Sequence, residues 1–191
     1  MAPYPTPMGV FTPYIARQSE TLVLKEKILS LSGDSFDVKT VDGRPIFKVE
    51  GSTLSLSSRK RILDTHGNHL FTIRKRLIAL HSTYYAEDPK GNQVFELKGK
   101  FSIGSSKSVG TFTSANGKNE YLLMKGDFFD RKADITDEVT KQPVAHIDRK
   151  FFNMREILGG QQTYAVTVAP NVDMAIVVAM CICLDERRNE N

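Results

Sequence analysis

The chain contains very little cysteine: Cys181 and Cys183 are the only two among its 191 residues. A disulfide framework is therefore excluded, which favours a reducing compartment, and we expect a cytoplasmic protein. On a helix, side chains two residues apart point roughly 200° apart, so these two thiols cannot bond to each other. We expect both to be buried and reduced.

Sequence motifs for metal or covalent chemistry are also missing. The histidines at 66, 69, 81 and 146 form no His-x3-His or His-Glu-x-x-His pattern, and no Cys-x2-Cys occurs. A zinc site is therefore not expected. No Gly-x-Ser-x-Gly elbow marks a serine hydrolase. The sequence thus predicts a protein that is not an enzyme and uses no metal or cofactor.

Two segments have part of a binding motif. The stretch from Gly99 to Gly104 has the glycines of a phosphate loop, but no lysine follows the second glycine and no helical pattern comes after it. The acidic cluster from Asp134 to Glu138 lacks the loop spacing and the central glycine of an EF-hand. We interpret the first as strand and loop, and the second as a solvated turn.

No apolar run is long enough to cross a bilayer, which takes about 20 residues. The unbroken apolar run from Met174 to Leu184 covers eleven and has no polar stripe. A helix of this kind must be surrounded by protein. We predict a central helix at about 171–187, with Asn171 as its N-cap, followed by a charged and solvated tail from Asp185. Its predicted core residues are Met174, Ile176, Val177, Val178, Met180, Cys181, Ile182 and Leu184.

The first fourteen residues carry prolines at 3, 5, 7 and 13. They lack the basic and apolar regions of a secretory signal. We expect a disordered or extended leader over 1–14. The rest, 15–188, is expected to form a single domain.

A spaced repeat of turn glycines runs through the middle of the chain. Gly43, Gly67, Gly91 and Gly117 are 24, 24 and 26 residues apart. An aromatic residue follows each after four positions, namely Phe47, Phe71, Phe95 and Tyr121, and a fifth unit would place Ala145 there. Pairs of the kind X-Gly suit two-residue hairpin turns.

Such turns fix which residues face each other. They pair Val38 with Phe47, Ala86 with Phe95, and Phe112 with Tyr121, so that apolar residues share one face. A chain of hairpins that must enclose an apolar helix predicts a mainly β fold, a closed antiparallel β-barrel. The interior of an eight-stranded barrel is just filled by its own side chains, so a barrel that encloses a helix needs some ten or more strands.

Several stretches resemble the LURP-one-related (LOR) family. The C-terminal one is Val168-Ala-Pro-Asn-Val-Asp173, an apolar run, and Leu184-Asp-Glu186; residues 42–49 and 61–68 are similar to the family's early hairpins. The likeness covers roughly 15–188. It implies a Tubby C-terminal-like fold of twelve strands around a hydrophobic C-terminal helix, thought to be shared with phospholipid scramblases. LOR proteins are known mainly from plants, some linked to pathogen defence, with no settled activity.

One cluster of basic residues is a candidate binding site. Arg59, Lys60 and Arg61 precede the turn at 66–67, and Arg74, Lys75 and Arg76 follow it. A two-residue turn pairs Arg59 with Arg74, and like charges directly opposite are destabilising, which favours a bound anion. A lipid headgroup or phosphate is the natural choice, since each charge near an anionic surface is worth about 1 kcal/mol. The resemblance to Tubby domains, which bind phosphoinositides through basic barrel residues, points the same way. Arginines on exposed strands also keep barrels soluble, so that alternative stays open.

Three functional hypotheses follow. The first is a non-enzymatic binding module that docks peripherally on anionic phospholipid or an acidic protein, in keeping with a net charge of +4. The second is a structural or protein-interaction domain in stress or defence signalling, marked by an exposed apolar patch on the barrel wall and no affinity for anions. The third is calcium-dependent lipid scrambling, which the short apolar run and the missing calcium loop oppose. Nucleic acid is not expected, because no base-stacking platform or recognition helix is evident.

Overall fold

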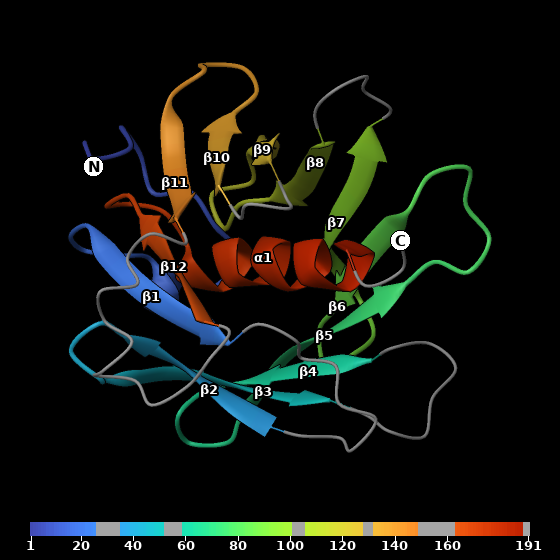
Figure 1. The fold of residues 1–191 in the computed structure, drawn as a ribbon, viewed down its shortest axis with the longest axis horizontal. Coiled ribbons are helices and arrows are strands. Elements are labelled where there is room, and N and C mark those ends of the chain that lie inside the picture. The colour runs from blue at the N-terminus through green and yellow to red at the C-terminus, as the bar shows by residue number, and fades with distance from the viewer. Residues whose placement is uncertain (26–34, 52–58, 101–105, 128–131, 149–162, 189–191) are drawn as a thin grey trace.

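A computed structural model describes residues 1–25, 35–51, 59–100, 106–127, 132–148 and 163–188. Twelve strands form one closed antiparallel barrel, in which each strand pairs with its neighbours along the chain and β1 closes the ring between β2 and β12 (Figure 1). The predicted fold class is confirmed. The elements are η1 (Thr12–Tyr14), β1 (Glu20–Lys25), β2 (Ser35–Thr40), β3 (Pro45–Gly51), β4 (Lys60–Leu63), β5 (His69–Lys75), β6 (Thr83–Glu87), β7 (Gln93–Lys100), β8 (Ser106–Thr113), β9 (Asn119–Asp127), β10 (Lys132–Asp137), β11 (Pro143–Asp148), β12 (Thr163–Val168) and α1 (Met174–Arg188).

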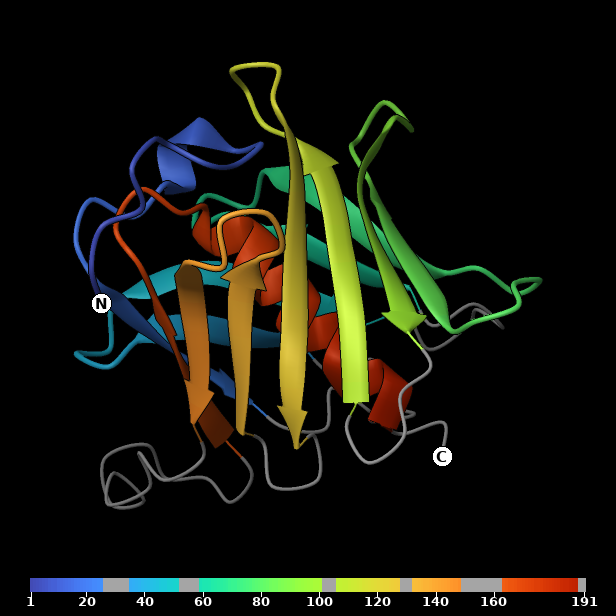
Figure 2. The ribbon, with the colours of Figure 1, turned by 90° about the horizontal axis from the view of Figure 1, so that it is seen from above.

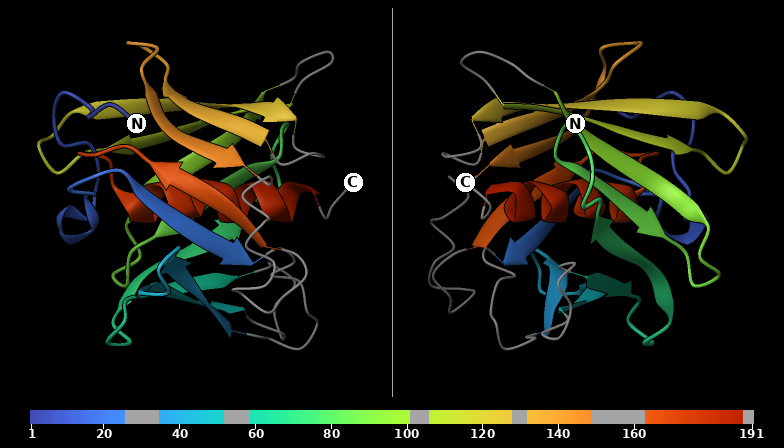
Figure 3. Two further views of the ribbon diagram at one scale, coloured as in Figure 1. Left: turned by 60° about the vertical axis from the view of Figure 1, so that its left-hand side comes forward. Right: turned by 90° about the vertical axis from the view of Figure 1, so that its right-hand side faces the viewer.

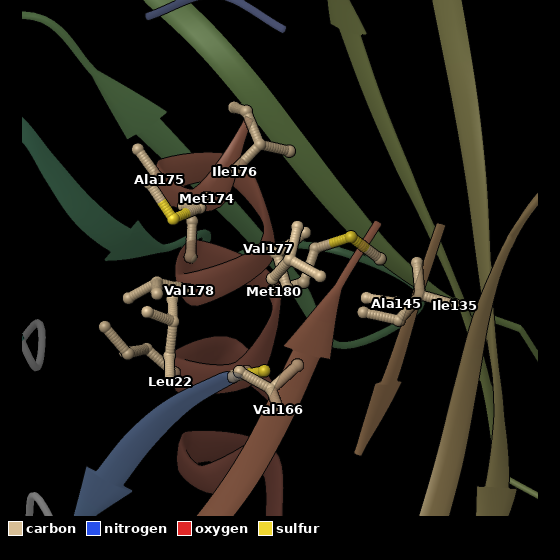
Figure 4. Close-up of a cluster of buried hydrophobic side chains, with 14 of the residues drawn as sticks. Leu22, Ile135, Ala145, Val166, Met174, Ala175, Ile176, Val177, Val178 and Met180 are labelled. Atoms are coloured by element: carbon tan, nitrogen blue, oxygen red, sulfur yellow. The ribbon is translucent and has the colours of Figure 1, made fainter. Parts of the chain in front are cut away.

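Helix α1 runs through the inside of the barrel (Figures 1 and 3). All eight residues predicted for its core are buried, with exposed fractions of 8 % or less. Inward side chains of the strands surround it, among them Leu22 of β1, Ile135 of β10 and Val166 of β12 (Figure 4). The helix needs no polar face because the wall covers every side of it.

The start of α1 differs from the prediction. Asn171 has φ 68°, a left-handed conformation, and lies before the helix rather than capping it. The cap is Asp173, whose Oδ1 accepts a hydrogen bond from the backbone N–H of Ala175 at 2.8 Å. A carboxylate satisfies the first helical N–H groups and interacts favourably with the helix dipole, so Asp173 takes the role predicted for Asn171.

The first three glycine hairpins have the predicted partners but not the predicted turns. Val38 faces Phe47 and Ala86 faces Phe95, as expected. The turns, however, hold three residues: the N–H of Gly43 donates to Thr40 O, and Thr40 N–H to Arg44 O. In each turn only the glycine has positive φ, whereas a type I′ turn needs it at both central residues. One extra residue on the second strand (Ile46, Leu70 or Val94) then restores the register.

The fourth hairpin lacks that extra residue, and its predicted register is wrong by one position. Phe112 faces Glu120 instead of Tyr121. Tyr121 therefore points outward and is 43 % exposed, while Glu120 is buried. In the glycine repeat, the position just before the aromatic residue is aliphatic in the first three hairpins and is Glu120 in the fourth. Glu120 binds Lys118 Nζ at 2.8 Å, so this carboxylate can take the inward position.

The N-terminal segment is extended, but it is packed on the barrel and is not a separate leader. The N–H of Tyr4 donates to Pro170 O at 3.0 Å, and that of Met8 to Asn171 O at 2.8 Å. Both side chains are buried. The expected boundary at residue 15 is thus corrected, because apolar side chains between the prolines bind this segment to the barrel. It covers the end of the barrel where α1 begins and where the short turn between β2 and β3 lies, which we call the turn end. The opposite end, where α1 ends and the loop between β5 and β6 lies, is the loop end (Figure 2).

Candidate functional site

Strand alternation separates the six predicted basic residues into two groups. On β4 and β5, Lys60 faces Ile73 and Arg61 faces Thr72. Continued by one residue, this register places Arg59 opposite Arg74, the predicted pairing. Lys60 is buried inside the barrel, whereas Arg61 is exposed on its outer surface. Lys75 pairs with the buried Tyr84 and lies at the inner rim.

The four outward residues, Arg59, Arg61, Arg74 and Arg76, form a surface that we call the arginine wall. Neighbouring strands supply carboxylates to it. Arg61 Nη1 lies 3.5 Å from Glu50 Oε2, Arg74 Nε lies 2.9 Å from Glu87 Oε2, and Arg76 Nε lies 3.3 Å from Glu96 Oε2. The facing arginines therefore do not by themselves indicate a bound anion, since carboxylates of β3, β6 and β7 offset part of their charge.

Arg76 is held against the outside of the barrel by contacts with two neighbouring strands. Its guanidinium carbon lies 4.6 Å from the centre of the Tyr85 ring. Nη2 also donates a hydrogen bond to Gln93 Oε1 at 2.6 Å. Cation–π contact and hydrogen bonding thus fix this arginine where β5 ends.

Lys60 has an interior partner at the end of the helix. Its Nζ lies 3.6 Å from Glu186 Oε1, and both side chains are almost fully buried. Beside this pair, Tyr164 donates a hydrogen bond to Asp185 Oδ2 at 2.9 Å. The tail predicted to be solvated from Asp185 onward is therefore buried at its start, because side chains of β4 and β12 meet these carboxylates.

The loop between β5 and β6 is the feature that sequence reasoning missed. Three aliphatic side chains lie on it almost fully in solvent: Leu77 is 73 % exposed, Ile78 98 % and Leu80 95 %. The loop projects past the loop end of the barrel (Figures 1 and 2). The signal was present in the sequence, as the run Leu-Ile-Ala-Leu directly follows Arg74-Lys75-Arg76.

A cavity of about 430 Å³ lies at the turn end. The ladder between β7 and β8 stops at the pair of Glu96 and Thr111, so the two strands separate beyond it. The cavity occupies this gap, and the N-terminal segment contributes Val10 to its lining. It is thus at the opposite end of the barrel from the loop between β5 and β6.

Within the described ranges, no group of three or more His, Cys, Asp and Glu side chains could hold a metal ion. In the same ranges, none of the helices is both long enough and apolar enough to span a membrane. Both cysteines are fully buried. Burial raises the pKa of each thiol, which keeps it protonated and unreactive at neutral pH.

Comparison with known proteins gives the family. The family model described as LURP-one-related matches residues 20–185. The chain belongs to the LURP-one-related family. It is 26 % identical to Protein LURP-one-related 10 of Arabidopsis thaliana over 197 residues, covering all of this chain and 94 % of the relative. Protein LURP-one-related 15 of the same plant is 23 % identical over 198 residues, again covering this whole chain and 91 % of the relative.

A solved structure supports the fold. The X-ray structure of an Arabidopsis thaliana protein superposes with a TM-score of 0.61 at 19 % identity, covering 95 % of this LURP-one-related chain and 99 % of the other. At that identity the likeness concerns the fold alone. The predicted family and the predicted barrel around a central helix are therefore both confirmed.

Proposed function

We propose that this LURP-one-related protein is a non-enzymatic module that docks reversibly on anionic phospholipid headgroups through the arginine wall. The supporting observation is a concentration of positive charge at one place. Arg74, Lys75 and Arg76 are consecutive where β5 ends, and the facing carboxylates of Glu87 and Glu96 balance only part of their charge. Arg59 lies next to this stretch on β4, by the register of the hairpin.

The most exposed of these ion pairs leaves Arg61 able to bind phosphate. In the pair of Arg61 and Glu50 the side chains are 53 % and 32 % exposed. Exposed ion pairs of this kind contribute only about 0–1 kcal/mol, so a competing anion displaces them at little cost. Arginine matches the geometry of phosphate oxygens, and each cation near an anionic membrane surface is worth about 1 kcal/mol. Such docking is peripheral, and we propose that it occurs on the cytoplasmic side of a membrane.

The test is co-sedimentation with vesicles of phosphatidylcholine that contain increasing phosphatidylserine or phosphoinositide. We expect the variant Arg59/Arg61/Arg74/Arg76→Ala to lose about tenfold or more in affinity, because four charges are removed. Binding by the wild type should weaken with added salt. A matched control removes four exposed cations away from the wall, Arg44/Lys90/Lys125/Lys141→Ala. Equal binding by wild type and the wall variant contradicts the proposal.

The alternative is a structural or protein-interaction domain in stress or defence signalling, including one that recognises an acidic protein. It predicts that the wild type sediments with no vesicle, whatever the lipid composition and salt. The same experiment therefore separates the two functions.

A further inference from the structure

The loop between β5 and β6 presents aliphatic side chains to water in a way that folded proteins rarely do without a partner. Leu77, Ile78 and Leu80 are between 73 % and 98 % exposed, and they lie within four consecutive residues. Scattered exposed leucines are ordinary, but a contiguous apolar group on a projecting loop marks an interaction site.

The base of this loop is firmly held. The N–H of Arg76 donates to Thr83 O at 2.9 Å and closes the hairpin. The Thr83 hydroxyl donates to His81 O at 2.9 Å, and Ser82 O accepts from the N–H of Gly99 on β7 at 3.0 Å. The tip is therefore carried on a fixed support at the loop end of the barrel, away from the core.

Charge and apolar surface follow each other in a definite order along this hairpin. The strand β5 ends in Arg74 and Lys75, Arg76 follows, and the aliphatic tip comes next. A membrane surface has the same order, with anionic headgroups outside and acyl chains beneath them. A stable protein interface covers about 800 Å² on each partner, far more than three side chains on a narrow tip provide.

We propose that Leu77, Ile78 and Leu80 insert among phospholipid acyl chains as a hydrophobic anchor, while the neighbouring basic residues stay at the headgroup level. This rests on the proposed function and adds an apolar contact to it. It also fixes orientation: the loop end of the barrel, where α1 ends, faces the bilayer, and the N-terminal segment faces away from it (Figure 2).

The chain contains no tryptophan, so a single introduced tryptophan is the only source of indole fluorescence. In Ile78→Trp, a single indole reports on the tip. With vesicles containing phosphatidylserine, we expect its emission to shift to the blue and to be quenched by phospholipids brominated on their acyl chains. The matched control is Val139→Trp, because Val139 is 75 % exposed in the turn between β10 and β11. Its emission should stay unchanged.

A second variant measures the contribution of the anchor to affinity. Leu77/Ile78/Leu80→Ser should weaken vesicle binding about tenfold or more, while the dependence on salt stays that of the wild type. Its thermal midpoint should also stay unchanged, because the three side chains are exposed. Wild-type binding with no shift or quenching at position 78 overturns insertion and leaves headgroup docking intact. Failure of the wild type to bind any vesicle overturns both proposals.

Discussion

At the scale of single residues, Gly110 is where the wall of the barrel makes room for the helix. It faces inward on β8 opposite Leu97. A Cβ atom at this position would lie 2.9 Å from Cε2 of Phe95 and 3.3 Å from the thioether end of Met180. The first distance is too short for two carbon atoms, and the aromatic ring is itself enclosed. The absence of a side chain is therefore required by packing, since interiors are filled to crystal-like density.

We expect Gly110→Ala to lower the free energy of unfolding by about 1–3 kcal/mol, the usual cost of overfilling a core. Urea unfolding followed by circular dichroism measures the change. Thr111→Ala on the adjacent outward position is the control and should have a much smaller effect. An unchanged midpoint for Gly110→Ala would show that the helix is not packed against β8 as described.

At the scale of elements, Asp173 joins the N-terminal segment to the start of α1. Its Oδ2 accepts hydrogen bonds from the N–H of Phe11 at 2.7 Å and of Val10 at 3.0 Å, while Oδ1 caps the helix through Ala175. Burial raises the pKa of this carboxyl to about 7, although these backbone N–H groups oppose the shift. One side chain thus holds together two elements that are far apart in the chain.

Stability should therefore depend on pH between about 4 and 7. Because the pKa of Asp173 is higher in the folded state than its ordinary 3.8, the folded protein binds the proton more tightly. The contribution of Asp173 to the free energy of unfolding is complete below about pH 4. As the pH rises through about 7 this contribution is lost, by up to about 4 kcal/mol. Denaturant unfolding at a series of pH values measures this. In Asp173→Asn, which does not titrate, that fall should disappear; a parallel fall in both proteins would assign it to other groups.

The carboxyls whose pKa is lowered affect stability in a different pH range. Hydrogen bonds within the turns lower the pKa of Asp64 and Asp88, chiefly those from Asn68 and Asn92. Their contribution is present above their ordinary pKa and is lost as the pH falls through the lowered value. They do not affect the range from pH 4 to 7, in which Asp173 titrates.

Much of the strand pairing could be predicted from the sequence, because alternation of apolar residues fixes which side chains share a face. Val38 and Phe47 are an example. The turn type could not, since a three-residue turn followed by one extra residue gives the same pairs as a two-residue turn. Glu120 was the signal that the fourth hairpin differs. The packing of residues 1–14 was not predicted, because the apolar residues between the prolines, such as Tyr4 and Met8, follow no helix or strand periodicity.

At the scale of the whole molecule, barrel and helix form one structure, and neither buries its apolar surface without the other. Cys181 and Cys183 are fully enclosed. We expect thiol reagents to modify them only when the whole barrel opens, so the labelling rate in increasing urea should follow global unfolding. Fast labelling of the native protein would show that α1 leaves the barrel on its own. Introducing a cysteine at the exposed Val139 gives the control for reagent reactivity.

The candidate site could be predicted only in part, because its environment is assembled by closure of the barrel. The register that aligns Arg59 with Arg74 follows from a local hairpin. The carboxylates of Glu50 and Glu96 come from strands on either side, and their positions depend on pairings beyond that hairpin. The burial of Lys60 with Glu186 depends on where the helix ends, which no local pattern shows.

Helix α1 follows all twelve strands in the chain, and this order has a consequence during synthesis. Chains fold from the N-terminus as the ribosome makes them, at about 5–20 residues per second. The early hairpins therefore emerge several seconds before the helix that fills the space inside the barrel. Until then the inward residues of the strands have no helix to pack against, so we expect the nascent protein to be prone to aggregation.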